Sequence, residues 1–295
     1  MILLLGKNGQ VAHELQRSLA PLGPVVVASR QGEGGVRADL AAPASLRDVV
    51  NQVKPRLIVN AAAYTAVDAA EDDEAAAVAV NATAPGLLAE LAQRIDATLI
   101  HYSTDYVFDG SASHPYTESS PTSPLGVYGR SKLEGERAIE QTGARHLILR
   151  TAWVYGRHGK NFFNTMRRLA CEREELSIVN DQVGSPTWSR HIAELTAQLI
   201  AQGLRDADYL AAHAGVYHLT NSGQCSWYDF AKAIIEPLPA EQRRCQTIHP
   251  IPSEAYPTPA KRPAYSVLDN SKLYRTFGLK LPDWRVALHQ CHSPT

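Results

Sequence analysis

The strongest constraint on the fold is a glycine-containing turn that directly follows a short apolar run at the N-terminus. Ile2-Leu3-Leu4-Leu5 is continuously apolar, which is typical of a central parallel strand covered on both faces. Gly6-Lys7-Asn8-Gly9-Gln10-Val11-Ala12 follows at once, and Leu15 and Leu19 continue with helical spacing. Bare backbone N–H groups at a helix N-terminus bind the pyrophosphate of a dinucleotide. This order predicts a dinucleotide-binding fold, with a plain strand–helix turn as the alternative.

The next apolar run, Val25-Val26-Val27-Ala28, ends in Ser29-Arg30. Many dinucleotide folds carry an acid here that binds the adenosine ribose and repels a 2'-phosphate. A hydroxyl and a guanidinium suit the 2'-phosphate instead, so we expect NADPH, with NADH as the second candidate. The alternative is an exposed arginine in a loop. Asp39 follows a third strand and is a candidate acceptor for the adenine amino group.

Further apolar runs predict a parallel sheet with helices between its strands. We expect strands at Leu57–Asn60, Thr98–Tyr102 and Arg145–Thr151, and a strand at Val216–Leu219 that returns to the same sheet after a helix at His191–Ala201. The Ala/Leu-rich segment from Glu71 to Ile95 predicts one long helix that its acids open, with Asn81–Pro85 as a candidate kink. The fold class is therefore α/β, a doubly wound parallel sheet of the Rossmann type.

Two tyrosine–lysine pairs have the four-residue spacing that brings both side chains to one helix face: Tyr128 with Lys132, and Tyr228 with Lys232. An ammonium near a phenol lowers the phenol pKa from about 10 and favours proton exchange with an alcohol or ketone oxygen. Thr104 lies 24 residues before Tyr128, at the carboxyl end of an expected strand, where open parallel sheets bind ligands. The segment upstream of Tyr228 has no comparable hydroxyl cluster. We therefore predict Tyr128, Lys132 and Thr104 as the catalytic residues and interpret Tyr228 as helix packing.

The net charge and the cysteine spacing bear on which partners and which cellular compartment we expect. The formal net charge of the 295-residue chain is -1, which gives no electrostatic argument for a nucleic-acid or membrane partner. The apolar start is too short for a membrane span and lacks a basic leader. Its four cysteines show no metal-binding spacing, so we expect reduced thiols in a cytoplasmic protein.

Taken together, seven motifs resemble the dTDP-4-dehydrorhamnose reductases, a family of extended short-chain dehydrogenase/reductases. They are GKNGQVA, VNAAAYTAVDAAE, HYSTDYVFDG, SPLGVYGRSKLEGE, RTAWVYG, NDQVGSPT and YPTPAKRP, and they span nearly the whole chain. The resemblance implies a Rossmann domain of residues 1–151 plus about 189–220. It also implies a smaller nucleotide-sugar lobe of about 152–188 plus 221–295. The implied reaction is the NAD(P)H-dependent reduction of the C4 ketone of dTDP-4-dehydro-L-rhamnose to dTDP-L-rhamnose, the last step of dTDP-rhamnose biosynthesis.

The resemblance also implies residue roles. Tyr128 would give the proton to the C4 oxygen, and Lys132 would hold the nicotinamide ribose and lower the Tyr128 pKa. The implied cofactor contacts are Gly6, Gly9, Gln10, Val11, Ala12, Arg30, Asp39, Leu40, Ala62, Ala63, Tyr64, Thr65, Tyr128 and Lys132. The implied substrate contacts are Thr104, Asp105, Tyr106, Tyr128, Trp153, Asn161, Gln182 and Arg262. Arg262 has two interpretations, a solvated basic turn or a clamp for the diphosphate.

One departure from the family pattern concerns a metal. Some relatives carry an acid near the start of the helix after SPT that helps Mg²⁺ to bridge two subunits, and this chain has Arg190 there. A guanidinium does not bind Mg²⁺, so we predict no such bridge and expect a monomer or a weak homodimer. Three alternatives stay open: another nucleotide-sugar reductase, an NAD-retaining epimerase or dehydratase, and a non-catalytic regulatory subunit.

Overall fold

The protein is described by a computed structural model that covers residues 1–33, 35–205 and 209–293. Seven parallel strands form the main sheet in the order β11-β6-β5-β4-β1-β2-β3. These strands are β1 (Ile2–Leu5), β2 (Val25–Ser29), β3 (Val36–Arg37), β4 (Leu57–Asn60), β5 (Thr98–Thr104), β6 (His146–Thr151) and β11 (Gly215–His218). The register pairs Leu5 with Ala28 and with Asn60, so the carboxyl ends of β1, β2 and β4 lie level at one edge. The predicted α/β doubly wound sheet is confirmed.

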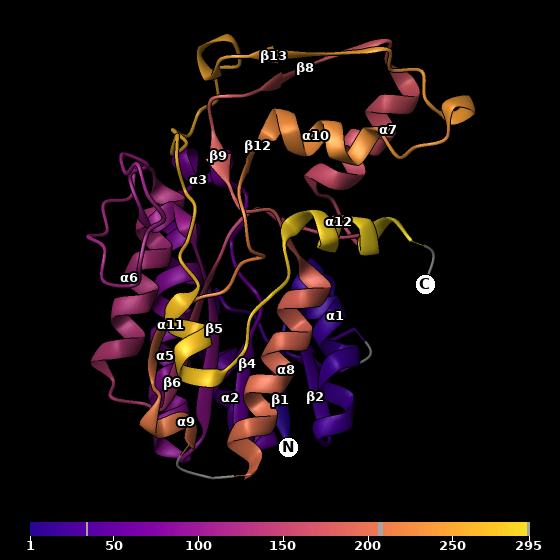
Figure 1. Ribbon diagram of the computed structural model, residues 1–295. Helices are drawn as coiled ribbons and strands as arrows, with labels where there is room; N and C mark the ends of the chain where they lie inside the picture. Colours follow the sequence, from indigo (N-terminus) through magenta and orange to yellow (C-terminus); the bar gives the residue numbers. More distant parts are fainter. Residues whose placement is uncertain (34, 206–208, 294–295) are drawn as a thin grey trace.

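Helices cover both faces of this sheet because its central strands are apolar on both sides. One face packs against α1 (Gln10–Leu19), α8 (Ser189–Arg205), α9 (Tyr209–Ala212) and α11 (Ser271–Phe277). The other face packs against α2 (Pro43–Val53), α5 (Ala84–Arg94) and α6 (Val127–Gln141). Figure 1 shows α1 and α8 on one side of the strands and α5 and α6 on the other.

The predicted long helix from Glu71 to Ile95 is wrong in its first part. Glu71 lies in the last turn of α3 (Val67–Asp72), and its carboxylate accepts a hydrogen bond from the Val127 N–H at the start of α6, at 2.8 Å. Asp73 then caps α4 (Glu74–Val78), which continues through a π-turn, η2 (Ala79–Thr83), into α5. The π-turn lies where Gly135 of α6 approaches so closely that a Cβ there would be 2.0 Å from the Asn81 carbonyl oxygen. The irregularity overlaps the candidate kink predicted at Asn81–Pro85, and close helix packing accounts for it.

Residues Glu74–Arg94 form one stretch that is long and apolar enough to cross a membrane by length and composition. However, 56% of its most apolar window is buried, and Leu88, Ala89 and Ala92 pack into the core between sheet and helices. We therefore interpret this stretch as a core helix. All four cysteines are free thiols, as predicted.

A smaller lobe stands at the carboxyl-terminal edge of the sheet (Figure 1). It contains β8 (Glu175–Val179) paired with β13 (Thr247–Ile251), and the helices α7 (Phe162–Glu172), α10 (Trp227–Ile235) and α12 (Trp284–His292). Two short strand pairs, β7 (Val154–Tyr155) with β10 (Thr187–Trp188) and β9 (Val183–Gly184) with β12 (Cys225–Ser226), join it to the sheet. The lobe has a core of its own, which includes Tyr155, Phe163, Phe230 and Trp284. The remaining short helical turns are η1 (Ala20–Leu22), η3 (Asp105–Val107), η4 (Ala240–Gln242) and η5 (Ser253–Ala255).

Candidate active site

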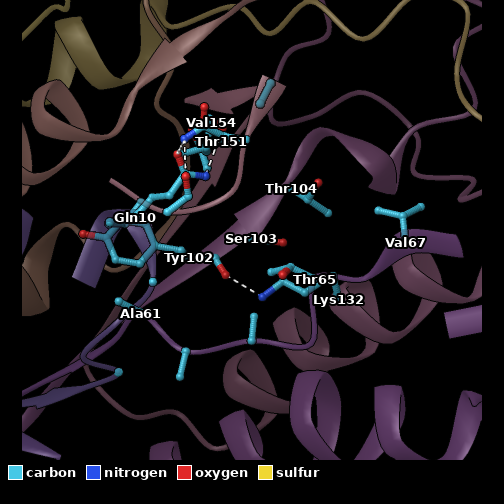
Figure 2. Close-up of a pocket in the computed structure, with 18 of the residues that line it drawn as sticks. Gln10, Ala61, Thr65, Val67, Tyr102, Ser103, Thr104, Lys132, Thr151 and Val154 are labelled. Carbon is cyan, nitrogen blue, oxygen red and sulfur yellow. Dashed lines mark hydrogen bonds between the residues drawn. The ribbon is translucent and has the colours of Figure 1, made fainter. Parts of the chain in front are cut away.

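A cavity of about 640 Å³ lies at the carboxyl ends of the central strands, where the glycine turn, the end of β5 and the start of α6 meet. Open α/β sheets bind ligands at this edge. Figure 2 shows its wall with Thr104 and Ser103 from β5, Thr65 after β4, and Gln10 from α1. The predicted residues that line it are Gly6, Gly9, Gln10, Val11, Ala62, Ala63, Thr65, Thr104, Tyr106, Tyr128, Lys132, Trp153 and Asn161.

The glycine turn fits a dinucleotide pyrophosphate. Gly6 has φ +103°, which side chains rarely tolerate, and a Cβ there would be 3.3 Å from the Ala61 backbone. Gly9 is the N-cap of α1 and offers no side-chain cap, so the first N–H groups of the helix are bare. A small anion can therefore approach the backbone directly, as NADPH requires.

Five predicted cofactor residues lie outside the cavity wall: Ala12, Arg30, Asp39, Leu40 and Tyr64. Ala12 is buried behind the turn, 3.3 Å from a Cβ on Gly6. Arg30 is exposed at the end of β2 and, among the described residues, makes no ion pair. The Asp39 carboxylate accepts a hydrogen bond from the Ala41 N–H. The Tyr64 N–H donates to the side-chain oxygen of Asn81. Contacts of these residues with the adenosine end of a cofactor stay predictions.

Tyr128 and Thr104 meet as predicted. Both residues line the cavity, the Thr104 hydroxyl acts as a hydrogen-bonding group that lowers the Tyr128 pKa, and the Tyr106 ring stands edge-on to Tyr128 at 5.5 Å. Burial raises the pKa of Tyr128 to about 12, and the bond to Thr104 opposes this only in part. The lowered pKa that we expected from Lys132 is therefore not found, because desolvation outweighs the effect of Thr104. A protonated phenol at neutral pH is suited to give a proton.

Asp105 does not line the cavity, contrary to the predicted contact with the sugar. It is 1% exposed and accepts the Thr104 hydroxyl hydrogen at 3.1 Å, while the Tyr106 N–H donates to Thr104 at 3.2 Å. Burial raises the pKa of Asp105 to about 6. The Thr104 hydroxyl therefore acts on both neighbours: it donates to Asp105, and it lowers the pKa of Tyr128. Asp105 thus orients Thr104 from behind.

Lys132 is fully buried at the base of the cavity, and its amine donates to the Tyr102 carbonyl at 2.6 Å (Figure 2). Its Nζ also lies 3.2 Å from His101 Nε2. Burial lowers the pKa of Lys132 to about 8. Sequence reasoning missed both partners. A backbone carbonyl leaves no trace in a sequence, and a histidine within an apolar strand gives no sign of which face it points to.

The second tyrosine–lysine pair is far less buried. The Lys232 side chain is 45% exposed, pairs with Glu236, and its Nζ lies 5.7 Å from the centre of the Tyr228 ring. Neither residue lines the cavity. The interpretation of this pair as part of helix packing agrees with its position on α10.

A second cavity, of about 500 Å³, lies between α3, α7, β8 and the proline-rich segment Ile251–Pro263. Gln182 and Arg262, which lie outside the first cavity, line this one. Arg262 is not a solvated turn residue: its side chain is 22% exposed and grips Asp68 through two bonds of 2.9 and 2.8 Å. The rest of the wall is largely apolar or aromatic, with Phe162, Met166, Leu169, Leu176, Ile178, Val179, Trp227 and Tyr256.

Trp153 and Asn161 mark the border between the two cavities. The Trp153 ring stacks on Trp227 at 3.5 Å, and Gly184 leaves room for it, since a Cβ there would be 2.4 Å from the indole. Trp153 lines the first cavity and Trp227 the second. Asn161 caps α7 and donates to Gln10 at 2.9 Å, which ties the glycine turn to the smaller lobe. Trp227, which the sequence analysis did not single out, is thus a further candidate site residue.

Arg190 occupies the position where some relatives have an acid. It stands at the start of α8 and pairs with Glu14 of α1 at 3.2 Å. Among the described residues, no group of three or more His, Cys, Asp or Glu side chains is arranged to hold a metal ion.

The structure combines a Rossmann sheet with a glycine turn and a Tyr–Lys–Thr set around one cavity. These features define the class of this protein, the extended short-chain dehydrogenase/reductases. Residues 1–295 match the family model described as the RmlD substrate binding domain. The dTDP-4-dehydrorhamnose reductase of Burkholderia thailandensis is 52% identical over 294 residues, which cover 98% of this chain and 97% of that protein. The chain therefore belongs to the dTDP-4-dehydrorhamnose reductase family.

Two further relatives agree with this result. The dTDP-4-dehydrorhamnose reductase of Escherichia coli K12 is 44% identical, with 97% of this chain and 95% of that protein covered. The crystal structure of the Bacillus anthracis dTDP-4-dehydrorhamnose reductase in complex with NADP superimposes with a TM-score of 0.88 at 33% identity. That match covers 98% of this chain and 97% of the other.

Proposed function

We propose that the protein is an NADPH-dependent dTDP-4-dehydrorhamnose reductase that converts dTDP-4-dehydro-L-rhamnose to dTDP-L-rhamnose, the last step of dTDP-rhamnose biosynthesis. The observation that carries this proposal is the full-length similarity to reductases of that name, joined to a Tyr–Lys–Thr set at one cavity. We also propose a cytoplasmic location and a monomer or weak homodimer.

The residues of the first cavity have separate roles in the proposed reduction. Bound NADPH supplies a hydride to the ketone carbon. Tyr128, whose pKa of about 12 keeps it protonated, gives its proton to the C4 oxygen of the sugar. Thr104, oriented by Asp105, fixes the direction of the phenol, and Lys132 holds the nicotinamide ribose. Buried and pre-oriented groups cost little reorganisation at the moment of reaction.

We propose that the sheet lobe, residues 1–151 plus about 189–220, binds the cofactor and that the remaining lobe binds the nucleotide of the sugar. The second cavity supports this, because aromatic side chains suit a pyrimidine ring and Arg262 suits a phosphate. A carboxylate and a phosphate present similar acceptor oxygens. The Arg262 guanidinium, which pairs with the Asp68 carboxylate in the structure, therefore has the shape to bind the diphosphate. The Asp68 side chain is 41% exposed and can turn to water.

We expect Arg262→Gln to raise the KM for the dTDP-sugar, because it removes a charge-assisted contact to the diphosphate. Loss of such a contact costs about 1.5–3 kcal/mol, which corresponds to roughly 10–100-fold in KM. Steady-state kinetics with NADPH in excess measures this value. Lys261→Gln is the matched control, since Lys261 is the exposed neighbour, and its KM should stay near wild type. Equal effects in both variants would remove Arg262 from this role.

Arg30 carries the proposed preference for NADPH. Arg30→Asp should lower the ratio of kcat/KM with NADPH to that with NADH by roughly 10–100-fold, because an acid replaces a guanidinium next to the 2'-phosphate. Arg56→Asp, an equal charge change at the amino end of β4, serves as the control and should leave the ratio unchanged. An unchanged ratio in Arg30→Asp would contradict the assignment.

Cofactor stoichiometry separates this proposal from its rivals. An epimerase or dehydratase recycles its NAD and consumes no net reductant, and a regulatory subunit converts no sugar. We expect one NADPH oxidised per dTDP-4-dehydro-L-rhamnose consumed. Sugar turnover without NADPH loss would favour an epimerase or dehydratase. The absence of any turnover, together with stoichiometric capture of another enzyme, would favour the regulatory subunit.

A further inference from the structure

The buried amine of Lys132 is hydrogen-bonded in a way that bears on its charge. Lys132 and His101 are 2% and 1% exposed, and 3.2 Å separates Lys132 Nζ from His101 Nε2. On the far side of the imidazole, Nδ1 lies 3.1 Å from the amide nitrogen of Asn60, which is also 1% exposed. A row of three buried polar side chains therefore ends at the amine.

The direction of every bond in this row follows from its first member. The Ala62 backbone N–H can only donate, and its partner at 3.3 Å is the side-chain oxygen of Asn60. The Asn60 amide nitrogen must then face His101, so His101 Nδ1 accepts a hydrogen bond. Burial keeps the pKa of His101 well below its usual value, so the ring is neutral and carries its one hydrogen on Nε2. That hydrogen points at Lys132.

An ammonium has three donors and no lone pair, whereas an uncharged amine can accept a hydrogen bond. We propose that His101 is a positioning residue that stabilises the uncharged form of Lys132, and that the uncharged fraction of Lys132 takes up a proton when NADPH binds. This inference rests on the proposed function, because it needs NADPH as the ligand. The proton comes from solvent and adds to the Nζ lone pair, and the anionic cofactor compensates the new charge.

The surroundings of Lys132 agree with an uncharged amine. Burial lowers its pKa, whereas Glu136, one turn along α6, raises it. Four acidic groups on α6 and on the elements packed around it already have partners. Glu136 pairs with Arg150 of β6, Asp105 of η3 accepts from Thr104, Glu71 of α3 accepts from Val127, and Glu74 of α4 pairs with Arg130.

In the structure, Tyr128 receives no help from Lys132. Its phenol pKa of about 12 reflects burial, Thr104 and Asp105, with no contribution from the lysine. A proton on Lys132 would place a positive charge below the same cavity and lower the phenol pKa. Cofactor binding would thereby lower the pKa of Tyr128, the acid that gives its proton to the ketone oxygen.

Isothermal titration calorimetry of NADPH binding, in buffers of different ionisation enthalpy, measures the protons taken up. With a free-state pKa of about 8 for Lys132, we expect uptake of roughly half a proton per site at pH 8 and almost none at pH 6.5. His101→Gln offers an amide oxygen to an ammonium, so the uptake at pH 8 should disappear while binding persists. Lys132→Met should also abolish it.

Binding of NADPH by the wild type without proton uptake at pH 8, or equal uptake in His101→Gln, would overturn the inference. A chain that bound no NADPH would overturn the proposed function as well, so the two failures are distinguishable. If His101→Gln does not fold, ¹⁵N NMR of the wild type decides the matter. We expect the Nε2–H tautomer at His101 without cofactor, and the Nδ1–H tautomer would contradict it.

Discussion

Tyr128→Phe should lower kcat by roughly 10²–10⁴-fold, the usual contribution of a positioned general acid. The hydroxyl is the only part of the side chain that the substitution removes, and the ring still packs edge-on against Tyr106. We therefore expect the dissociation constants for NADPH and for the dTDP-sugar to stay close to wild type. Rapid-quench turnover and equilibrium binding, measured on one preparation, separate these effects.

The chain provides a matched control for this variant. Tyr228 also stands four residues before a lysine, but it lies on α10 away from both cavities. Tyr228→Phe should leave kcat unchanged. A Tyr128→Phe enzyme with near wild-type turnover, or an equal loss in Tyr228→Phe, would remove Tyr128 from the role of proton donor.

Glu136→Ala should destabilise the fold by about 3–5 kcal/mol, the usual cost of leaving one partner of a buried ion pair alone. Arg150 donates to the two Glu136 oxygens at 2.9 and 2.6 Å, and the two side chains are 5% and 2% exposed. This pair joins α6, which carries Tyr128 and Lys132, to strand β6. Urea unfolding measures the loss of free energy.

Two comparisons make this second prediction specific. Replacing both partners, as in Glu136→Leu with Arg150→Met, should recover most of the loss because no unpaired charge remains buried. Glu172→Ala breaks the exposed Arg168–Glu172 pair, whose side chains are 59% and 49% exposed, and should change stability by at most about 1 kcal/mol. A loss below about 1 kcal/mol in Glu136→Ala would contradict the structural role that we assign to the pair.

Local patterns predicted the parts of the molecule that depend on neighbours in sequence. The run Ile2–Leu5 followed by Gly6 specifies a buried strand and a tight turn, and the structure has both. The choice of Tyr128 over Tyr228 agrees with the geometry, because a parallel sheet brings its strand ends together and Tyr128 and Thr104 line one cavity, whereas Tyr228 lines neither cavity.

Long-range burial explains what the sequence could not predict. Desolvation reverses the expected shift of the Tyr128 pKa, and the extent of burial depends on the whole fold. Glu71 looked like the opening of a helix but binds the N–H of Val127, 56 residues later. Asp105 looked like a sugar contact, yet its strand end turns the carboxylate into the interior, behind Thr104.

The central claim is that the protein transfers a hydride to C4 of a dTDP-keto sugar. Incubation with dTDP-4-dehydro-L-rhamnose and NADPH deuterated at nicotinamide C4, followed by NMR of the product, tests it most directly. We predict dTDP-L-rhamnose with one deuterium at C4 for each NADPH oxidised. A product without the label, or with the opposite configuration at C4, would contradict the account.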